Sequence, residues 1–529
     1  MATGRGEHPM RRPAAFAGFA ALSLILTGIA GRILSYPLNR DENLFIAAAS
    51  QLGSGDLYRD LGYNHLPNFA YLLGGFYRLT NAQYLLLSGR LLMFVGWIAA
   101  LCAIWLLVRK ARQGIELFFA SSALLVGNVF LLGPSGMLVS NNFIPIPCIL
   151  FAFFLLWRAL EHGPPRSIDA FVAGVLVSLT IGLKANYIIL APFFALATVI
   201  APRALSIGQR LLRGSLPLAI GGLVGGLPVL IHMALDPQGF IAHTLRYFTE
   251  LQPAFWRSVD GPKTVSIADK ILLAEEVWMS GVVLMAAATS AVLCGIVILR
   301  SGARGLLDWR VLILSGLLAC SVLVAFVPTP SFPQYFVPPV PFLILLMIVL
   351  ASMVEGGSRA FVQVLMIVFA LLGLVTGASR VLPGLLAFRD PGSWQSLEIH
   401  REIREMGRAA GLAKGARIAA LTPVPALEGG YAIYPEFAAG QFVYRVAPYI
   451  APADRRFYRT TSPAGLFEFL DANPPAGILV NPAEPIETRL AEYARARGFV
   501  RLDNLNRYGS FDLYIPSSGN AASPPSARR

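Results

Sequence analysis

Residues 14–45, AAFAGFAALSLILTGIAGRILSYPLNRDENLF, join a long apolar run to two adjacent carboxylates. The run up to residue 35 is long enough to cross the roughly 30 Å hydrocarbon core of a bilayer. Arginines precede it, so it resembles a signal peptide that is retained as a membrane anchor. Asp41 and Glu42 follow where this first span ends. Two acids at the start of a helix are either a helix cap or the base of an active site, and the rest of the sequence has to decide.

The composition of the chain is typical of an integral membrane protein. Of its 529 residues, 55% are hydrophobic and only 14% are charged, whereas soluble domains carry about a quarter charged residues. The net charge of +13 does not predict a nucleic-acid partner, because membrane proteins collect Lys and Arg in their cytoplasmic loops. The four cysteines all lie in apolar runs without a CxxC pattern, and we expect small buried side chains, neither disulfides nor a metal site.

About eleven apolar runs predict a polytopic α-helical membrane protein. Each is close to the length of about 20 residues that a spanning helix needs, allowing for short or tilted segments. The runs lie at 14–35, 84–108, 115–133, 143–160, 168–184, 187–201, 216–235, 277–299, 311–328, 336–353 and 360–379.

The charges of the connections predict the orientation of these spans. With the N-terminus in the cytoplasm, the inner connections include RKARQG (109–114) and PRALSIGQRLLRGS (202–215), which are rich in arginine. The outer connections PSGMLVSNN (134–142) and TPSFPQY (329–335) contain no Lys or Arg. This bias is typical of the positive-inside rule. We therefore expect a multi-pass protein of the cell's inner (plasma) membrane, and an odd number of spans places the C-terminal segment outside the cytoplasm.

Three parts of the chain are expected to lie outside the bilayer. The first outward loop, 36–83, carries two short helices that are too short to span and that we expect along the membrane surface. A second outward loop covers 236–275. After residue 384 the composition is that of a soluble domain in which strands and helices alternate. The predicted strands are RIAAL (417–421), AGILV (476–480), FVRLD (499–503) and SFDLYIP (510–516). The sequence thus predicts a membrane domain over 1–383, a small extracytoplasmic α/β domain over 384–518, and a disordered tail over 519–529. No glycine fingerprint or P-loop announces nucleotide binding in the α/β domain.

Polar residues gather at the outward ends of the predicted helices. Lys184 is the most informative, because a lysine beside the hydrocarbon is costly unless its ammonium snorkels to the interface or meets an anion. A base, a cation and hydrogen-bonding groups on one membrane face suggest transfer chemistry on a lipid-linked phosphate. The candidates are Asp41, Glu42, Asn64, His65, Asn141, Asn142, Lys184 and Tyr335.

Over residues 15–380 the chain resembles the membrane glycosyltransferases of the GT-C fold. Within them it is most similar to the superfamily of protein O-mannosyltransferases and bacterial aminoarabinose and galacturonosyl transferases. RDENLF matches the acidic pair that follows the first span, and NHLPNFAYLL matches loosely a cation, a proline and an aromatic helix. LTIGLKANY matches an internal helix that ends in lysine, and QYFVPPVPF matches a tyrosine–proline element.

The sequence departs from this pattern at two places. His65 stands where many relatives have lysine, and Asn141 and Asn142 stand where many have an aspartate. Histidine is only partly charged near neutral pH, so it would bind a phosphate more weakly than lysine does. Hard divalent cations prefer carboxylates, so we expect no obligatory metal, and no cofactor is implied.

The resemblance implies a donor, an acceptor and a role for each candidate. A polyprenyl-phosphate sugar would be the donor, and a hydroxyl of a lipid, glycan or protein would be the acceptor. Asp41 would take the proton of that hydroxyl, and the sugar would transfer with inversion. Lys184 with His65 would stabilise the leaving phosphate, and Tyr335 would bond the phosphate or the sugar. Glu42 orients the acceptor or only caps the helix, while Asn64 and Asn142 are expected to bind substrate.

Two other classes of protein remain as alternatives. A lipid-linked polysaccharide ligase or polymerase would use the same donor and would rely on arginines of a late outward loop, here Arg246 or Arg257. A transporter would place acids inside its spans and show paired repeats with broken helices. Acids are nearly absent from these spans, which disfavours a transporter, and a purely structural membrane protein would not need Lys184.

Overall fold

The computed structural model describes residues 11–161, 163–259, 266–279, 281–354, 358–502 and 511–517. The predicted tail, 519–529, lies outside the described residues. The chain forms two compact units. One, here called the helical unit, comprises Met1–Ser35, Met93–Leu230 and Pro262–Pro391; the other, called the mixed unit, comprises Tyr36–Leu92, Ile231–Gly261 and Gly392–Arg529.

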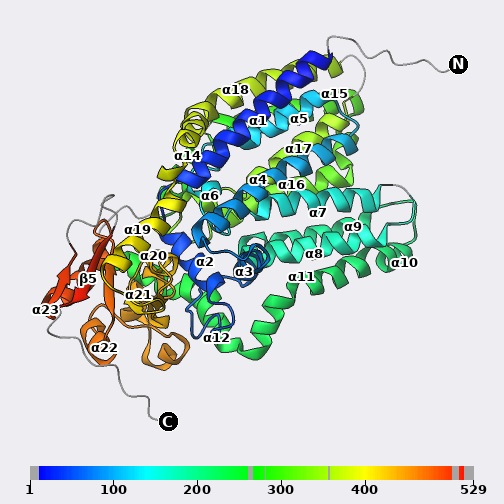
Figure 1. Ribbon diagram of the computed structural model, residues 1–529. Helices are drawn as coiled ribbons and strands as arrows, with labels where there is room; N and C mark the ends of the chain where they lie inside the picture. Colours follow the sequence, from blue (N-terminus) through cyan, green and yellow to red (C-terminus); the bar gives the residue numbers. More distant parts are fainter. Residues whose placement is uncertain are drawn as a thin grey trace. The chain divides into compact units, whose positions relative to one another are not determined.

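Each of the eleven predicted apolar runs coincides with a helix (Figure 1). These helices are α1 (Arg11–Ser35), α4 (Leu85–Lys110), α5 (Ile115–Val126), α7 (Pro145–Leu160), α8 (Ser167–Leu183), α9 (Leu190–Ile200), α11 (Leu216–Leu235), α15 (Gly281–Ser301), α16 (Trp309–Ala325), α17 (Pro339–Ser352) and α18 (Ser358–Leu386). Shorter helices join them, among them α6 (Pro134–Met137), α10 (Ile207–Arg210) and α14 (Ile267–Trp278).

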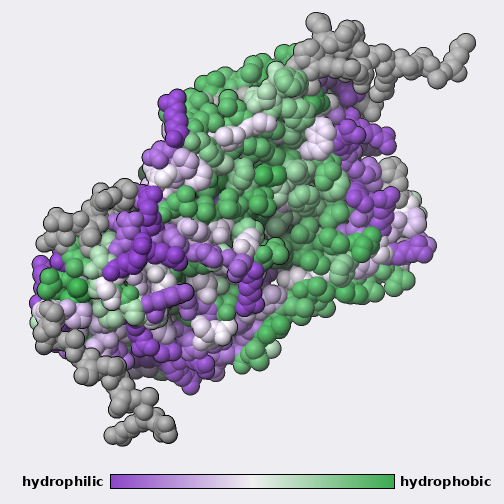
Figure 2. Space-filling model, in the orientation of Figure 1, coloured by the Kyte–Doolittle hydropathy of each residue, from purple (hydrophilic) through white to green (hydrophobic). Residues whose placement is uncertain are grey.

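The chain is a multi-pass membrane protein. Among the described residues, five helices are long and apolar enough to cross a bilayer, or six if the bent pair Ser358–Gly373 and Val375–Arg389 forms one span. Five further apolar helices are shorter, at 10–17 residues. Apolar side chains cover much of the surface formed by these helices (Figure 2). The count of eleven crossings, the predicted orientation and the choice of membrane stay predictions.

Glycines allow two pairs of helices to pack backbone to backbone in the helical unit. A Cβ added at Gly221 of α11 would lie 1.9 Å from the carbonyl oxygen of Phe171 in α8. A Cβ at Gly384 of α18 would lie 1.9 Å from the carbonyl oxygen of Gly28 in α1. Any larger residue would separate these helices, and small residues at contacts are typical of helix packing in membranes.

The prediction that the four cysteines are buried is wrong. All four are free, Cys102 is exposed, and the other three are half-buried. A helix that faces lipid exposes apolar side chains, so an apolar run does not by itself imply burial within the protein.

The mixed unit contains a five-stranded sheet in the order β2-β1-β3-β5-β4. β1 pairs in parallel with β2 and β3, whereas β5 pairs antiparallel with β3 and β4. The strands are β1 (Arg417–Ala419), β2 (Ala432–Ile433), β3 (Gly477–Val480), β4 (Phe499–Arg501) and β5 (Asp512–Pro516). The helices of the same segment are α19 (Gln395–Ala409), α20 (Pro423–Glu428), α21 (Gln441–Val446), α22 (Leu466–Ala472) and α23 (Thr488–Ala496). The small α/β arrangement that the sequence predicted is therefore present.

The mixed unit contains the first outward loop, the second outward loop as far as Gly261, and the C-terminal segment from Gly392. This grouping differs from the division predicted at residue 384, because contacts far apart in the sequence decide it. The first loop contains the two short helices that were predicted, α2 (Arg40–Ser50) and α3 (Asn68–Thr80). The second contains α12 (Pro237–Ile241), the π-helical segment Ala242–Leu251, and α13 (Gln252–Ser258).

Candidate functional site

Asn39 is the N-terminal cap of α2. Its side-chain oxygen accepts a hydrogen bond from the backbone N–H of Asp41 (3.1 Å), and its own N–H donates to Glu42 (3.1 Å). This reciprocal arrangement is a capping box, which satisfies backbone donors at both positions. Asn39 therefore occupies the N-cap position of α2, and Glu42 closes the capping box.

Glu42 also forms a buried ion pair with Arg90, which lies near the start of α4. Both side chains are fully buried, and the two carboxylate oxygens accept from the guanidinium at 3.1 and 3.0 Å. Arg90 in turn donates to the backbone oxygen of Tyr36 (2.6 Å). Since both oxygens of Glu42 already accept hydrogen bonds, its carboxylate holds the start of α2 in place. This geometry gives Glu42 a positioning role.

The residues on either side of Asp41 and Glu42 are also held. Arg40 donates to Glu484 at 2.9 Å, and Asn43 accepts from the backbone N–H of Val424 at 3.1 Å. Asp41 itself is half-buried. The first turn of α2 is thus fixed to the rest of the mixed unit by side chains before and after Asp41.

His65 lies in a box of aromatic rings. Its ring centroid is 5.0 Å from Phe45, 5.3 Å from Phe248 and 6.0 Å from Tyr63. Its Nδ1 lies 3.0 Å from the side-chain oxygen of Asn64, which is fully buried. Phe45 belongs to α2, so the box brings His65 next to the helix that carries Asp41.

Tyr247 and Arg445 join this cluster, and the sequence did not single them out. The buried Tyr247 hydroxyl donates to the backbone oxygen of Phe442 (3.2 Å). Burial raises the pKa of Tyr247 and the charge of Asp41 adds to this, while nearby Arg445 and Asn64 oppose it. Asp41, Asn64 and Arg445 therefore all lie within electrostatic reach of one hydroxyl. A local signal for Tyr247 was the aromatic-rich run RYFTELQPAFW; Arg445 had none.

The helical unit holds a second polar cluster around Lys184. Lys184 is buried at the break between α8 and α9, and its ammonium donates to the side-chain oxygen of Asn142 (2.6 Å) and the backbone oxygen of Gln334 (3.3 Å). It also lies over the Tyr335 ring, 5.4 Å from the centroid. Asn141 donates to the last backbone oxygen of α8, that of Leu183 (2.8 Å). Three segments far apart in the sequence thus orient one cation.

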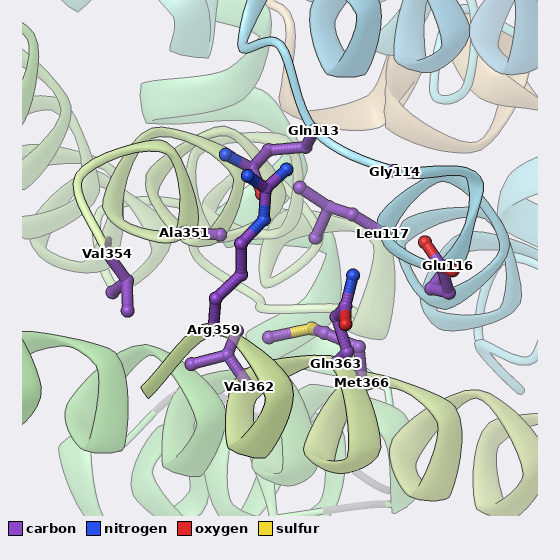
Figure 3. Close-up of a pocket in the computed structure, with 10 residues that line it drawn as sticks. All are labelled: Gln113, Gly114, Glu116, Leu117, Ala351, Val354, Arg359, Val362, Gln363 and Met366. Atoms are coloured by element: carbon purple, nitrogen blue, oxygen red, sulfur yellow. The ribbon is translucent and has the colours of Figure 1, made fainter. Parts of the chain in front are cut away.

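The predicted site residues accordingly fall into two clusters. Asp41, Glu42, Asn64 and His65 belong to the mixed unit, and Asn141, Asn142, Lys184 and Tyr335 belong to the helical unit. Among the described residues, no three His, Cys, Asp or Glu side chains group as a metal site would. A solvent-open hollow of about 330 Å³ in the helical unit, lined by Gln113, Glu116, Arg359 and neighbouring residues, includes none of the candidates (Figure 3).

Comparison with known proteins gives a clear structural match and no sequence match. No family model matches the chain, and no curated protein matches it. The crystal structure of ArnT from Cupriavidus metallidurans bound to undecaprenyl phosphate superposes with a TM-score of 0.57 and 13% identity, covering 98% of this chain and 100% of ArnT. The apo form gives 0.58 and 11%, with 97% and 100% covered. The Archaeoglobus fulgidus oligosaccharyltransferase gives 0.44 and 11%, with 87% of this chain and 69% of that one covered.

These findings define the class of the protein. It is a polytopic membrane protein with the GT-C fold, as the sequence predicted. Over nearly its whole length its fold is similar to that of ArnT.

Proposed function

We propose that this chain is an integral membrane glycosyltransferase that moves a sugar from a polyprenyl phosphate to a hydroxyl of a cell-envelope acceptor. The reaction takes place on the extracytoplasmic face and inverts the anomeric carbon. The observation that carries the proposal is the position of Asp41, which stands in the first turn of α2 behind an asparagine cap. Asn39 supplies the cap, and for a chain of the GT-C fold we assign the carboxylate of Asp41 the role of general base.

The proposed reaction forms one bond and breaks one bond. The acceptor oxygen attacks the anomeric carbon and loses its proton to Asp41. The bond between that carbon and the phosphate oxygen breaks, and polyprenyl phosphate leaves with the electron pair. Lys184, oriented by Asn142 and Tyr335, stabilises the charge that develops on the phosphate.

The remaining candidates support this division of labour. Glu42 holds the start of α2 and acts through Asp41, since Arg90 and Asn39 occupy its oxygens. His65 and Asn64 contribute to the wall of aromatic and amide groups beside α2. A lipid donor reaches such a site already held at one depth in the membrane, which lowers the entropic barrier to the encounter.

The alternative of a lipid-linked polysaccharide ligase or polymerase would require a free arginine in the second outward loop, and Arg246 does not meet this requirement. That guanidinium donates to both oxygens of Asp454 at 2.9 and 2.6 Å and also to Glu250, so it holds the mixed unit together. Arg257 is exposed on α13. A transporter is not favoured, because Asp169, an acid near the end of a span, pairs with Arg158 (3.2 Å).

The test supplies purified protein in nanodiscs with either polyprenyl-phosphate sugars or labelled nucleotide sugars, without other enzymes. Transfer should occur from the lipid donor. Lys184→Ala should reduce donor use by at least about tenfold, and Lys184→Arg should reduce it less if charge alone matters. Lys270 is a matched control, because it is also buried in the helical unit and donates to neutral oxygens, those of Phe326 and Thr329, both at 2.8 Å.

Lys270→Ala should retain the transfer rate per folded molecule. Transfer from the nucleotide sugar alone would refute the choice of donor. An equal loss in Lys184→Ala and Lys270→Ala would show that Lys184 serves the fold and not the donor.

A further inference from the structure

Arg445 is a buried cation surrounded by aromatic rings. It lies on α21 and is 8% exposed. Its guanidinium carbon lies 4.9 Å from the ring centroid of Phe442, 5.1 Å from that of Phe255 and 5.4 Å from that of Trp256. Cation–π contacts of this kind offset part of the cost of removing the charge from water, but they satisfy none of the five N–H donors.

Within the described part of the chain, Arg445 forms no ion pair with a carboxylate, and its Nε has no hydrogen-bond partner. A second buried donor, the side-chain nitrogen of Asn64, also has no partner there. Both groups lie beside the Tyr247 hydroxyl. Buried donors without acceptors are costly, and the Nε of Arg445 and the side-chain nitrogen of Asn64 are two such donors at one place among the described residues.

Other buried or half-buried arginines of the mixed unit are paired. Arg90 is bound by Glu42, and Arg246 is bound by Asp454. An arginine that only stabilised the fold would be expected to have such a carboxylate, because an unpaired buried charge destabilises the protein. Arg445 lacks such a carboxylate partner among the described residues, and it lies in the cluster that contains Asp41 and His65.

We propose that Arg445, Asn64 and Tyr247 form a binding site for an anionic oxygen group of a substrate, a phosphate or a carboxylate. A planar guanidinium donates to such a group through two parallel N–H bonds, and the side-chain amide of Asn64 adds a further donor. Tyr247, whose hydroxyl donates to the backbone oxygen of Phe442, lies beside these donors and lines the site. The inference rests on the proposed transferase function only for the source of the anion. That source is either the phosphate of the lipid donor or an acidic group of the acceptor.

The test measures binding without catalysis. Full-length protein in nanodiscs is titrated with inorganic phosphate, with a soluble sugar phosphate and with polyprenyl phosphate, and the dissociation constant is obtained from the rise in unfolding temperature. Arg445→Met keeps an unbranched apolar stem against the rings and removes the charge. We expect binding to weaken by about 10- to 100-fold. Arg257→Met, on the helix that carries Phe255 and Trp256, is the control and should bind like the wild type.

Without ligand, Arg445→Met should unfold at the same or a higher temperature than the wild type, because an unpaired buried charge is removed. If this variant does not fold, Asn64→Ala removes the second donor and should weaken binding about tenfold. Wild-type affinity in a folded Arg445→Met, or no stabilisation of the wild type by any of the three probes, would overturn the proposal.

The probes also separate the two sources. Stabilisation by polyprenyl phosphate that depends on Arg445 assigns the site to the donor, and stabilisation by the soluble sugar phosphate alone assigns it to the acceptor. Either result supports the anion site. Because the readout is binding, absence of sugar transfer in the wild type would refute the proposed function and leave this result unchanged.

Discussion

The substitution Asp41→Asn tests whether Asp41 acts in catalysis or in capping α2, because the two roles predict different effects on the transfer rate and on stability. Asn39 is the cap, so the substitution leaves the capping box intact. What it removes from the fold is a negative charge in the first helical turn, worth about 0.3–1 kcal/mol. If Asp41 is the general base, the substitution lowers the transfer rate by about 10²–10⁴-fold, which corresponds to about 3–5 kcal/mol in the barrier. The effect on rate should therefore far exceed the effect on stability.

The matched control is Asn39→Ala. Loss of the cap should reduce the free energy of unfolding by about 1 kcal/mol and leave a folded protein with most of its activity. Both variants are measured by radiolabelled sugar transfer in nanodiscs and by thermal unfolding in the same preparation. The reasoning fails if Asp41→Asn transfers sugar at close to the wild-type rate, or if its loss of activity is matched by an equal loss in Asn39→Ala.

Three further predictions follow from single contacts. Glu42→Gln leaves a buried guanidinium without its carboxylate and should reduce the free energy of unfolding by about 3–5 kcal/mol, measured by thermal or denaturant unfolding; an unchanged melting temperature would refute the positioning role. Burial lowers the pKa of His243 from 6.5 to about 4. The free energy of unfolding, highest above pH 6.5, should therefore fall by up to about 3 kcal/mol as the pH approaches 4. In His243→Gln the difference in this free energy between pH 7 and pH 4.5 should be smaller than in the wild type, and an unchanged difference would exclude His243 as its origin. In a cysteine-free background, Ser54→Cys and Ala453→Cys, both exposed, should react with an impermeant thiol reagent in intact cells, while Ser206→Cys should not; labelling of the last alone would reverse the topology.

The apolar helices and the main strands could be predicted from the sequence because their signals are local. A run of apolar residues near bilayer length predicts a helix wherever it occurs, and each of the eleven runs contains one. The break at Lys184 was also visible, because a lysine and Asn186 interrupt one long stretch, and α8 does end at Leu183. β2 was missed because its two residues are too few to show alternation.

The capping box of α2 is encoded locally, but the acidic pair obscures it. Asn39 is followed three residues later by Glu42, which is the spacing of a capping box with asparagine in place of the usual serine or threonine. The two adjacent acids make Asp41 the more conspicuous candidate for the cap. The spacing from Asn39 nevertheless assigns different roles to the two carboxylates, because Glu42 alone stands at the position that closes the box.

The ion pair of Glu42 and the cluster around Tyr247 could not be found in this way. Glu42 meets a residue 48 positions later, and Arg445 approaches a hydroxyl almost 200 positions before it in the chain. Such contacts depend on how the first outward loop, residues Ile231–Gly261 and the C-terminal segment fold into one unit, and the periodicity of the sequence does not encode this. These contacts also bear on whether Asp41 and Glu42 act as a helix cap or as a catalytic base. Arg90 and Asn39 hold Glu42, so we assign the chemistry to Asp41 alone. The cation that we propose to bind a substrate in the mixed unit is Arg445, a residue without any motif around it.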